Sequence, residues 1–181
     1  MAKTAQKHPI QLLHSIELEC KKTAKGLPQR ADIKESWTGI GFRLNDINLV
    51  APLKQVNEIL HLPRLTHVPG TQKWVKGVAN IRGTLLPIID LQGFLHEKPL
   101  PQTGKSRVLV VKRDELSVGL VVSEVLGLKH FQDEERVTAV SKFDESMRTY
   151  VHGAFKQNGQ EILVFSMYAL ADNPHFFQVA V

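Results

Sequence analysis

Residues 73–95 read Lys-Trp-Val-Lys-Gly-Val-Ala-Asn-Ile-Arg-Gly-Thr-Leu-Leu-Pro-Ile-Ile-Asp-Leu-Gln-Gly-Phe-Leu, two apolar runs separated by a short polar corner. Such runs on either side of a glycine-containing turn are typical of a β-hairpin. Asn80 and Arg82 fall on one face of the first run, because side chains alternate along a strand. Gly83 permits a tight bend directly after them. The stretch therefore predicts two strands whose polar residues gather at the turn.

Two residues of the second run complete this corner. Pro87 has no backbone donor, so it fits an edge or a bulge better than the centre of a sheet. Asp90 can cap the helical turn that we expect at 91–95, because its side chain can accept hydrogen bonds from backbone N–H groups at a helix start. We therefore expect Gly83, Pro87 and Asp90 to be structural residues of the corner.

Similar apolar runs flank turn residues on both sides of this stretch. Hairpins are expected around Asn45-Asp46, Asp114-Glu115 and Asn158-Gly159, the last being the strongest turn signal in the chain. Further strands are expected at 61–68 and 125–131, and a short helix at 53–60. Strands in hairpins, without alternating helices, favour closed β-barrels or a sandwich over a parallel nucleotide-binding sheet.

The number of expected strands, about ten, exceeds what one small barrel holds. We therefore expect a mainly β fold of two small barrels packed together, with brief helices and possible exchange of strands. Loop 97–106, with two prolines, is the best boundary between the barrels. The predicted organisation is a segment 1–36, a body 37–175 with its subdomain boundary near 97–106, and a C-terminal tail 176–181.

The N-terminal segment is predicted to contain a helix at 9–25, followed by a polar linker at 28–36. Pro9 suits the first helical turn, and Gly26 and Pro28 end the helix. Apolar residues recur at three- and four-residue steps and share one face: Leu12, Leu13, Ile16, Cys20 and Ala24. The pattern leaves open whether this face docks on the body or on a partner.

Composition places the chain among ordinary globular proteins, with 181 residues, 43% of them hydrophobic and 23% charged. The single cysteine, Cys20, excludes an intramolecular disulfide and favours a reducing compartment. No apolar run approaches the ~18 residues of a membrane span, so membrane insertion is not expected. The first residues do not have the pattern of a signal peptide.

The net charge of +5 is concentrated before the body. Residues 1–36 contain seven basic and four acidic residues, a net charge of +3. The body therefore lacks the strong positive charge that a nucleic-acid-binding domain usually carries, and no nucleic acid partner is expected. A small β-barrel that binds nucleic acid stays as the weaker alternative, because the pI is 9.4.

No group of residues meets the requirements of a catalytic or metal site. Gly104-Lys105-Ser106 resembles the end of a phosphate loop, but Pro99 stands where that loop needs a glycine. His61 and His67 lack a third nearby ligand. We therefore predict no catalytic residue, no metal and no cofactor, and binding is favoured over catalysis. An enzyme that uses His67 or His152 is a weaker alternative.

Several motifs resemble the signature of CheW-type coupling proteins. Gly77-Val-Ala-Asn-Ile-Arg-Gly83, followed by Leu86-Pro-Ile-Ile-Asp-Leu91, resembles the central motif of that family. Val56-Asn-Glu-Ile59 resembles its Val-x-Glu-Ile element. The run Val118-Gly-Leu-Val-Val-Ser-Glu-Val125 resembles its Gly-x-x-Val-Asp-x-Val strand, although Ser123 stands where the family often has aspartate.

This resemblance implies two five-stranded barrels and a non-catalytic adaptor function. The implied partners are the regulatory domain of a CheA-type histidine kinase and the cytoplasmic tip of a methyl-accepting chemoreceptor. By position in the motifs, the resemblance implies partner-binding roles for Arg82, Glu58, Val56 and Asn80. The residues alone leave open whether Arg82 contacts a partner or bonds to carbonyl groups of its own barrel.

Other features resemble one subfamily more than a minimal CheW. The N-terminal helix, Trp37, Trp74-Val-Lys-Gly77 and Phe94-Leu95 look like the coupling proteins of type IV pilus and twitching-motility arrays. The implied output is twitching motility, with a flagellar chemotaxis adaptor as the alternative. The implied location is cytoplasmic, at membrane-associated receptor arrays.

Overall fold

The computed structural model describes residues 9–23, 36–137 and 145–181. The chain divides into two compact units, residues 1–33 and 34–181, which are described separately. The first unit contains helix α1 (Pro9–Thr23), in agreement with the expected helix up to residue 23. The expected helix end at Gly26 and most of the expected linker lie outside the described residues. None of the helices in the described ranges is long and apolar enough to cross a membrane.

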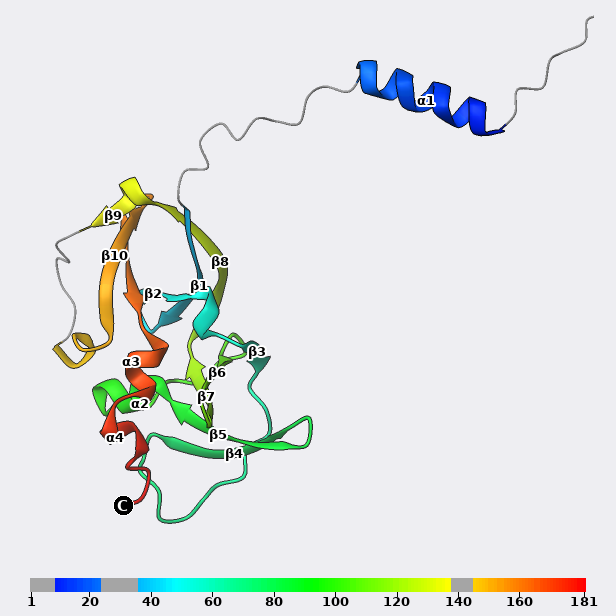
Figure 1. Ribbon diagram of the computed structural model, residues 1–181. Coiled ribbons are helices and arrows are strands. Elements are labelled where there is room, and N and C mark those ends of the chain that lie inside the picture. The colour runs from blue at the N-terminus through cyan, green and yellow to red at the C-terminus, as the bar shows by residue number, and fades with distance from the viewer. Residues whose placement is uncertain (1–8, 24–35, 138–144) are drawn as a thin grey trace, which may run out of the picture. The chain divides into compact units, whose positions relative to one another are not determined.

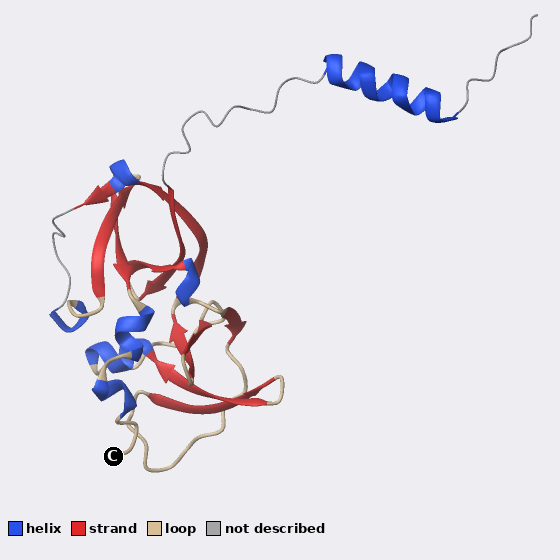
Figure 2. Cartoon of the chain, in the orientation of Figure 1, coloured by secondary structure: helices blue, strands red, loops and turns tan. Residues whose placement is uncertain are grey.

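The second unit, the body, is built on two sheets (Figures 1 and 2). The first sheet has the strand order β8-β1-β2-β11-β10-β9. Its pairings are antiparallel except between β2 and β11. The strands are β1 (Ser36–Leu44), β2 (Ile47–Pro52), β8 (Glu124–Gln132), β9 (Arg136–Val137), β10 (Val151–Gln157) and β11 (Gln160–Phe165).

The second sheet has the strand order β3-β6-β7-β5-β4. Its pairings are antiparallel except between β5 and β7. The strands are β3 (Glu58–His61), β4 (Val75–Ile81), β5 (Thr84–Asp90), β6 (Arg107–Arg113) and β7 (Leu116–Val122). The two outer strands, β3 and β4, therefore have no strand neighbour on one side within the sheet.

The helices of the body are short. Helix α2 (Leu91–His96) follows β5, and α3 (Met167–Ala171) and α4 (Pro174–Phe177) follow β11. Three single turns of 3-10 helix complete the described elements: η1 (Leu53–Gln55), η2 (Asp133–Glu135) and η3 (Glu145–Met147).

The expected mainly β fold is confirmed: two sheets, short helices and an N-terminal helix. The first sheet has a sixth strand, the two-residue β9, beyond the five expected. Residues 97–106, the expected subdomain boundary, join α2 to β6, and the strands on both sides of this loop, β5 and β6, lie in the same sheet. The chain instead passes between the sheets after β2 and after β7, so the first sheet combines both ends of the body.

The helix expected at 53–60 is wrong beyond its first turn. Only residues 53–55 are helical, and residues 58–61 form strand β3, which pairs with β6. Apolar residues in this short segment fit the helix period and the strand period equally well, so the tertiary pairing decides between them.

Each sheet contributes buried side chains on both of its faces, one set to a shared central core and the other to an outer core, because side chains alternate along a strand. The central core takes residues from both sheets, among them Phe42 and Leu49 from the first and Leu109 and Leu120 from the second. Neighbouring residues on the same strands enter two further clusters. Val50, Phe131, Phe155 and Ile162 form one, and Ile88, Val108, Val110 and Val121 belong to the other. Burial on both faces explains the unbroken apolar runs of β6 and β7.

The C-terminal residues are tied to the body. Phe176 is 3% exposed in the central core, and its ring stacks on Trp74 at a centroid distance of 6.2 Å. Beyond it, the backbone N–H of Gln72 donates to the carbonyl of Val179, and the N–H of Val181 donates to the carbonyl of Gly70. Residues 176–181, expected as a tail, thus begin inside the core and continue along the loop before β4.

Candidate functional site

The corner expected from the sequence is a two-residue turn between β4 and β5. Ile81 pairs with Thr84, so Arg82 and Gly83 occupy the two central positions. Both have positive φ angles, 53° and 85°, as a type I′ hairpin turn requires. The side-chain oxygen of Asn80 accepts a hydrogen bond from the N–H of Gly83 at 2.8 Å. Asn80 therefore holds the turn that carries Arg82.

Arg82 forms an ion pair with Glu58. The distance from Arg82 Nη2 to Glu58 Oε1 is 2.6 Å. Glu58 begins β3, and Arg82 follows β4, so the pair joins the two outer strands of the second sheet, which are not neighbours in it. The Arg82 side chain is 80% exposed and that of Glu58 is 31% exposed. The pair thus presents a charged, accessible surface made from two distant parts of the sequence.

The backbone of Arg82 is in a conformation that arginine rarely adopts. The corresponding turn residues before β2, β7 and β11 also have positive φ angles, but they are Asn45, Asp114 and Asn158, whose short side chains tolerate this region. A long side chain there costs about 1–2 kcal/mol, and an exposed ion pair returns only ~0–1 kcal/mol. Fold stability alone therefore does not account for an arginine at this turn.

Val56 and Pro87, also indicated by the sequence, lie in the framework around the ion pair and do not contact it in the hydrogen bonds and ion pairs described. Val56 is partly buried and packs against the central core. Pro87 lies opposite Val78, whose backbone N–H and carbonyl bond to Thr66 instead of to β5. The missing donor of Pro87 therefore leaves no gap in the ladder between β4 and β5.

Asp90 is 1% exposed and bonds both to the first turn of helix α2 and to the loop after this helix. Its Oδ1 accepts from the N–H of Gly93 at 2.9 Å, and its Oδ2 accepts from the N–H of Leu100 at 2.8 Å. The carboxylate thus caps the helix start and also fixes the loop that follows the helix.

Ser123, the departure from the expected aspartate, also contacts a turn. Its Oγ accepts from the N–H of Asn45 at 2.9 Å, and its N–H donates to the carbonyl of Arg43 at 3.0 Å. A serine hydroxyl thus supplies an acceptor for the β1–β2 turn, and the chain needs no carboxylate for this bond.

A second surface was missed by the sequence reasoning. Leu53 is 44% exposed and Leu128 is 50% exposed. Leu128 on β8 lies opposite Ile40 on β1, and Ile40 lies opposite Ala51 on β2. Opposite residues share a face, so Leu128 continues the face that carries buried Ile40. Leu53 follows Ala51 by two residues, in η1, which contacts β1. We call this exposed apolar pair the Leu53–Leu128 surface.

The sequence indicates this surface only weakly. Leu128 stands between Gly127 and Lys129, and Leu53 directly follows Pro52. Single leucines in such places are common on protein surfaces. Only the strand pairing shows that Leu128 lies opposite buried Ile40 and that η1, which carries Leu53, contacts the same strand β1.

Described residues of the body also border open cavities. One of about 870 Å³ is bordered by Trp74, Phe94, Tyr150 and Asn173, and one of about 340 Å³ is bordered by Asn45, Gln92 and His96. Neither contains the Arg82–Glu58 pair. Within the described residues, no group of three or more His, Cys, Asp or Glu side chains is placed to hold a metal ion. The Arg82–Glu58 pair offers charged and hydrogen-bonding groups at an accessible surface.

Comparisons with a family model and with individual relatives indicate the same family. Residues 38–175 match the CheW-like domain. The chain is 44% identical over 173 residues to protein PilI of Pseudomonas aeruginosa, covering 96% of this chain and 97% of that protein. It is 25% identical over 142 residues to the chemotaxis protein CheW of Bacillus subtilis, covering 78% and 91%.

A solved structure has the same fold. The scaffolding protein TtCheW from Thermoanaerobacter tengcongensis superposes with a TM-score of 0.67 at 20% identity, covering 80% of this chain and 98% of that one. The first residues of the chain, including α1, precede the matched domain. The alignment with PilI, which omits 4% of the chain, extends into α1.

Proposed function

The chain belongs to the CheW-like domain family, and from this membership we propose that it is a non-catalytic adaptor in chemosensory signalling. It couples the cytoplasmic tip of a methyl-accepting chemoreceptor to the regulatory domain of a CheA-type histidine kinase. Its output is twitching motility driven by type IV pili. The similarity to PilI over nearly the full length of both proteins supports this output over a flagellar one.

The observation that carries the proposal is the Arg82–Glu58 pair on its strained turn. Arg82 uses one terminal nitrogen for Glu58, which leaves the rest of its planar guanidinium for a carboxylate of the kinase domain. Glu58 fixes the direction of the guanidinium, Asn80 holds the turn, and Val56 anchors the segment before Glu58 in the core. In this proposal the pair is the kinase-binding contact.

The Leu53–Leu128 surface is the proposed receptor contact. Exposed leucines beside a buried core match the apolar stripe of a helical hairpin. Transient signalling interfaces are small and concentrate their affinity in a few such anchors. Because this surface borders the first sheet and the ion pair borders the second, both partners can bind at the same time, and assembly alone controls the kinase.

Titration calorimetry with purified partners tests the proposal. The kinase regulatory domain and a soluble receptor-tip fragment from the same organism are titrated separately into the full chain. We expect both to bind. Arg82→Asp is expected to lower the affinity for the kinase domain at least tenfold, since an aspartate would repel Glu58 and the partner carboxylate. Arg148→Asp, which alters an exposed arginine after η3, is the matched control. Absence of binding to both partners would overturn the proposal.

The output and location are tested in cells. Deletion of the gene is expected to abolish twitching and to leave swimming intact, and a fluorescent fusion is expected to collect at receptor arrays on the cytoplasmic side of the membrane. Loss of swimming with normal twitching would assign the chain to flagellar chemotaxis instead.

A further inference from the structure

One short segment carries residues of both proposed surfaces. Leu53 of the apolar surface and Glu58 of the ion pair are separated by only four residues. These residues also take the chain from the first sheet to the second, since β2 ends at Pro52 and β3 begins at Glu58. We call residues 53–58 the crossover segment. Its conformation sets where Leu53 and Glu58 stand relative to each other.

Helix α3 binds the crossover segment through Gln55. The first N–H groups of a helix have no partner within the helix. In α3, Ser166 caps the N–H of Ala169, whereas the N–H groups of Met167 and Tyr168 donate to the side-chain oxygen of Gln55, at 2.7 and 3.4 Å. A residue 112 positions earlier in the sequence thus completes the cap, and the cap fixes the crossover segment.

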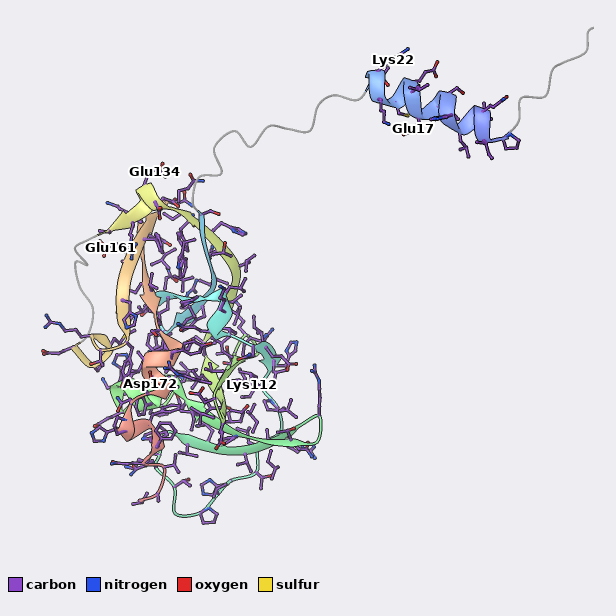
Figure 3. The ribbon with its side chains drawn as sticks, viewed as in Figure 1. Glu17, Lys22, Lys112, Glu134, Glu161 and Asp172 are labelled. Atoms are coloured by element: carbon purple, nitrogen blue, oxygen red, sulfur yellow. The ribbon has the colours of Figure 1, made fainter. Side chains whose placement is uncertain are left out.

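Tyr168 of α3 also bonds to this segment, and Arg113 of β6 contacts Tyr168. The hydroxyl of Tyr168 donates to the carbonyl of Lys54 at 3.2 Å. Arg113 at the end of β6 lies over the Tyr168 ring, 4.7 Å from its centroid, and pairs with Asp172 at 3.0 Å. Figure 3 labels Lys112, the neighbour of Arg113 on β6, and Asp172, which directly follows α3.

The last residue before Glu58 is bonded to β6. The side-chain oxygen of Asn57 accepts from the N–H of Lys112 at 2.7 Å, and its own N–H donates to the carbonyl of Val110 at 2.8 Å. The hydrogen bonds that Gln55 and Lys54 accept from α3, and those between Asn57 and β6, therefore order the crossover segment from two sides.

We infer that Gln55 is a positioning residue for both partner surfaces, because it holds the crossover segment in its binding conformation before either partner arrives. The inference rests on the proposed function, since it assigns Leu53 to the receptor and Glu58 to the kinase. Gln55 itself touches neither partner. It acts through the cap of α3, which makes α3 a remote support for the site.

This arrangement has a thermodynamic consequence. With the segment ordered in advance, neither partner spends binding free energy on ordering it, so the two bind almost independently. If the segment is released, the first partner must order it and binds more weakly. The second partner then meets an ordered segment and binds better than it would alone. Releasing the segment therefore weakens each partner and creates positive cooperativity between them.

Gln55→Ala tests this inference in the full-length chain. Each partner is titrated alone and again in the presence of a saturating amount of the other. For Gln55→Ala we expect each partner alone to bind about fivefold more weakly, the effect of losing a hydrogen bond of ordinary net strength, and most of that loss to be recovered when the other partner is present. Tyr168→Phe removes only the bond to Lys54 and is expected to change affinity in the same direction by less.

Two variants serve as controls. Gln55→Glu keeps an oxygen that accepts from both N–H groups, so it is expected to restore separate binding of the partners at wild-type affinity. Gln72→Ala removes another side chain-to-backbone bond, from the Gln72 amide to the carbonyl of Ala180, and is expected to leave both affinities unchanged. Thermal unfolding of each variant is measured to check that the fold is retained.

The outcomes separate the inference from the proposed function. If the wild-type chain binds neither partner, the proposed function fails. If the wild-type chain binds both and Gln55→Ala binds them equally well, the inference is wrong. It is also wrong if Gln55→Ala loses affinity without cooperativity, or if Gln55→Glu behaves like Gln55→Ala.

Discussion

Arg82 and Glu58 are 24 residues apart in the sequence, yet their side chains form a 2.6 Å ion pair between the two outer strands of one sheet. The arginine stands in a left-handed turn position that three other hairpins of the described body give to asparagine or aspartate. An exposed ion pair adds little stability. Fold stability alone therefore does not explain an arginine at this turn, and the proposed partner contact would account for it.

Replacing Arg82 with asparagine separates the effect of the side chain on partner binding from its effect on stability. Asparagine suits the positive φ angle, so Arg82→Asn is expected to leave the free energy of unfolding unchanged or to raise it by about 1 kcal/mol. The same variant is expected to lose at least tenfold in affinity for the kinase regulatory domain. Urea unfolding and calorimetric titration measure the two effects. A variant that unfolds more easily than the wild type would make Arg82 a structural residue.

The reverse substitution at another hairpin is the matched control. Asn158 has a φ angle of 52° in the turn before β11. Asn158→Arg is expected to lower the free energy of unfolding by about 1 kcal/mol and to leave kinase affinity intact. If it has no effect on stability, the left-handed turn position is not costly for arginine in this fold.

Polar substitution at Leu128 is expected to act on the receptor alone. Leu128→Ser removes an exposed apolar contact of the Leu53–Leu128 surface without opening a cavity in the core. We expect affinity for the receptor-tip fragment to fall about tenfold, the effect of losing one leucine anchor, with kinase affinity unchanged. Val181→Ser, at a valine that is 90% exposed, is the control. Equal receptor binding by the Leu128 and Val181 variants would remove this surface from the proposal.

The sequence predicts the local elements well because turn chemistry and alternation are local signals. Asn158-Gly159 forms the turn expected of it. The hairpin expected around Gly83-Thr84 also forms, but its turn lies one residue earlier, so that Arg82 is in the turn and Thr84 in the strand. It predicts connectivity poorly, since loop 97–106 marks a break in composition, while the passages between sheets occur elsewhere. The parallel pairing of β2 with β11 joins residues more than 100 positions apart, and no short-range pattern encodes it.

For the candidate site, too, the sequence indicates single residues but not the long-range contacts between them. The resemblance to family motifs indicates Arg82 and Glu58 separately, but their contact depends on the fold of the second sheet, whose two outer strands position them. Gln55 carries no motif, because a glutamine that caps a helix 112 residues later has no local sequence signature. Long-range contacts of this kind are visible only in the folded chain.

Removal of the Asp90 carboxylate is expected to destabilise the body without touching either proposed surface. Asp90→Ala leaves the buried N–H of Leu100 and the partly buried N–H of Gly93 without their acceptor, which costs about 1–3 kcal/mol in the free energy of unfolding. Urea unfolding followed by fluorescence measures the loss. Kinase and receptor affinities are expected to remain at wild-type values at a temperature where the variant is folded. A variant as stable as the wild type would show that other groups can cap α2.

A methyl group at Gly77 is expected to have the largest effect on stability. Gly77 has a φ angle of 131°, and a Cβ atom there would lie 2.3 Å from the carbonyl oxygen of Thr66. The neighbouring residues Thr66 and Val78 exchange two backbone hydrogen bonds, so the clash cannot be relieved without breaking the contact that covers β4. Gly77→Ala is expected to lower the free energy of unfolding by about 3 kcal/mol or more. Gly104→Ala is the control, because a Cβ atom there meets nothing within 4 Å, and equal stability of the two variants would contradict this account of β4.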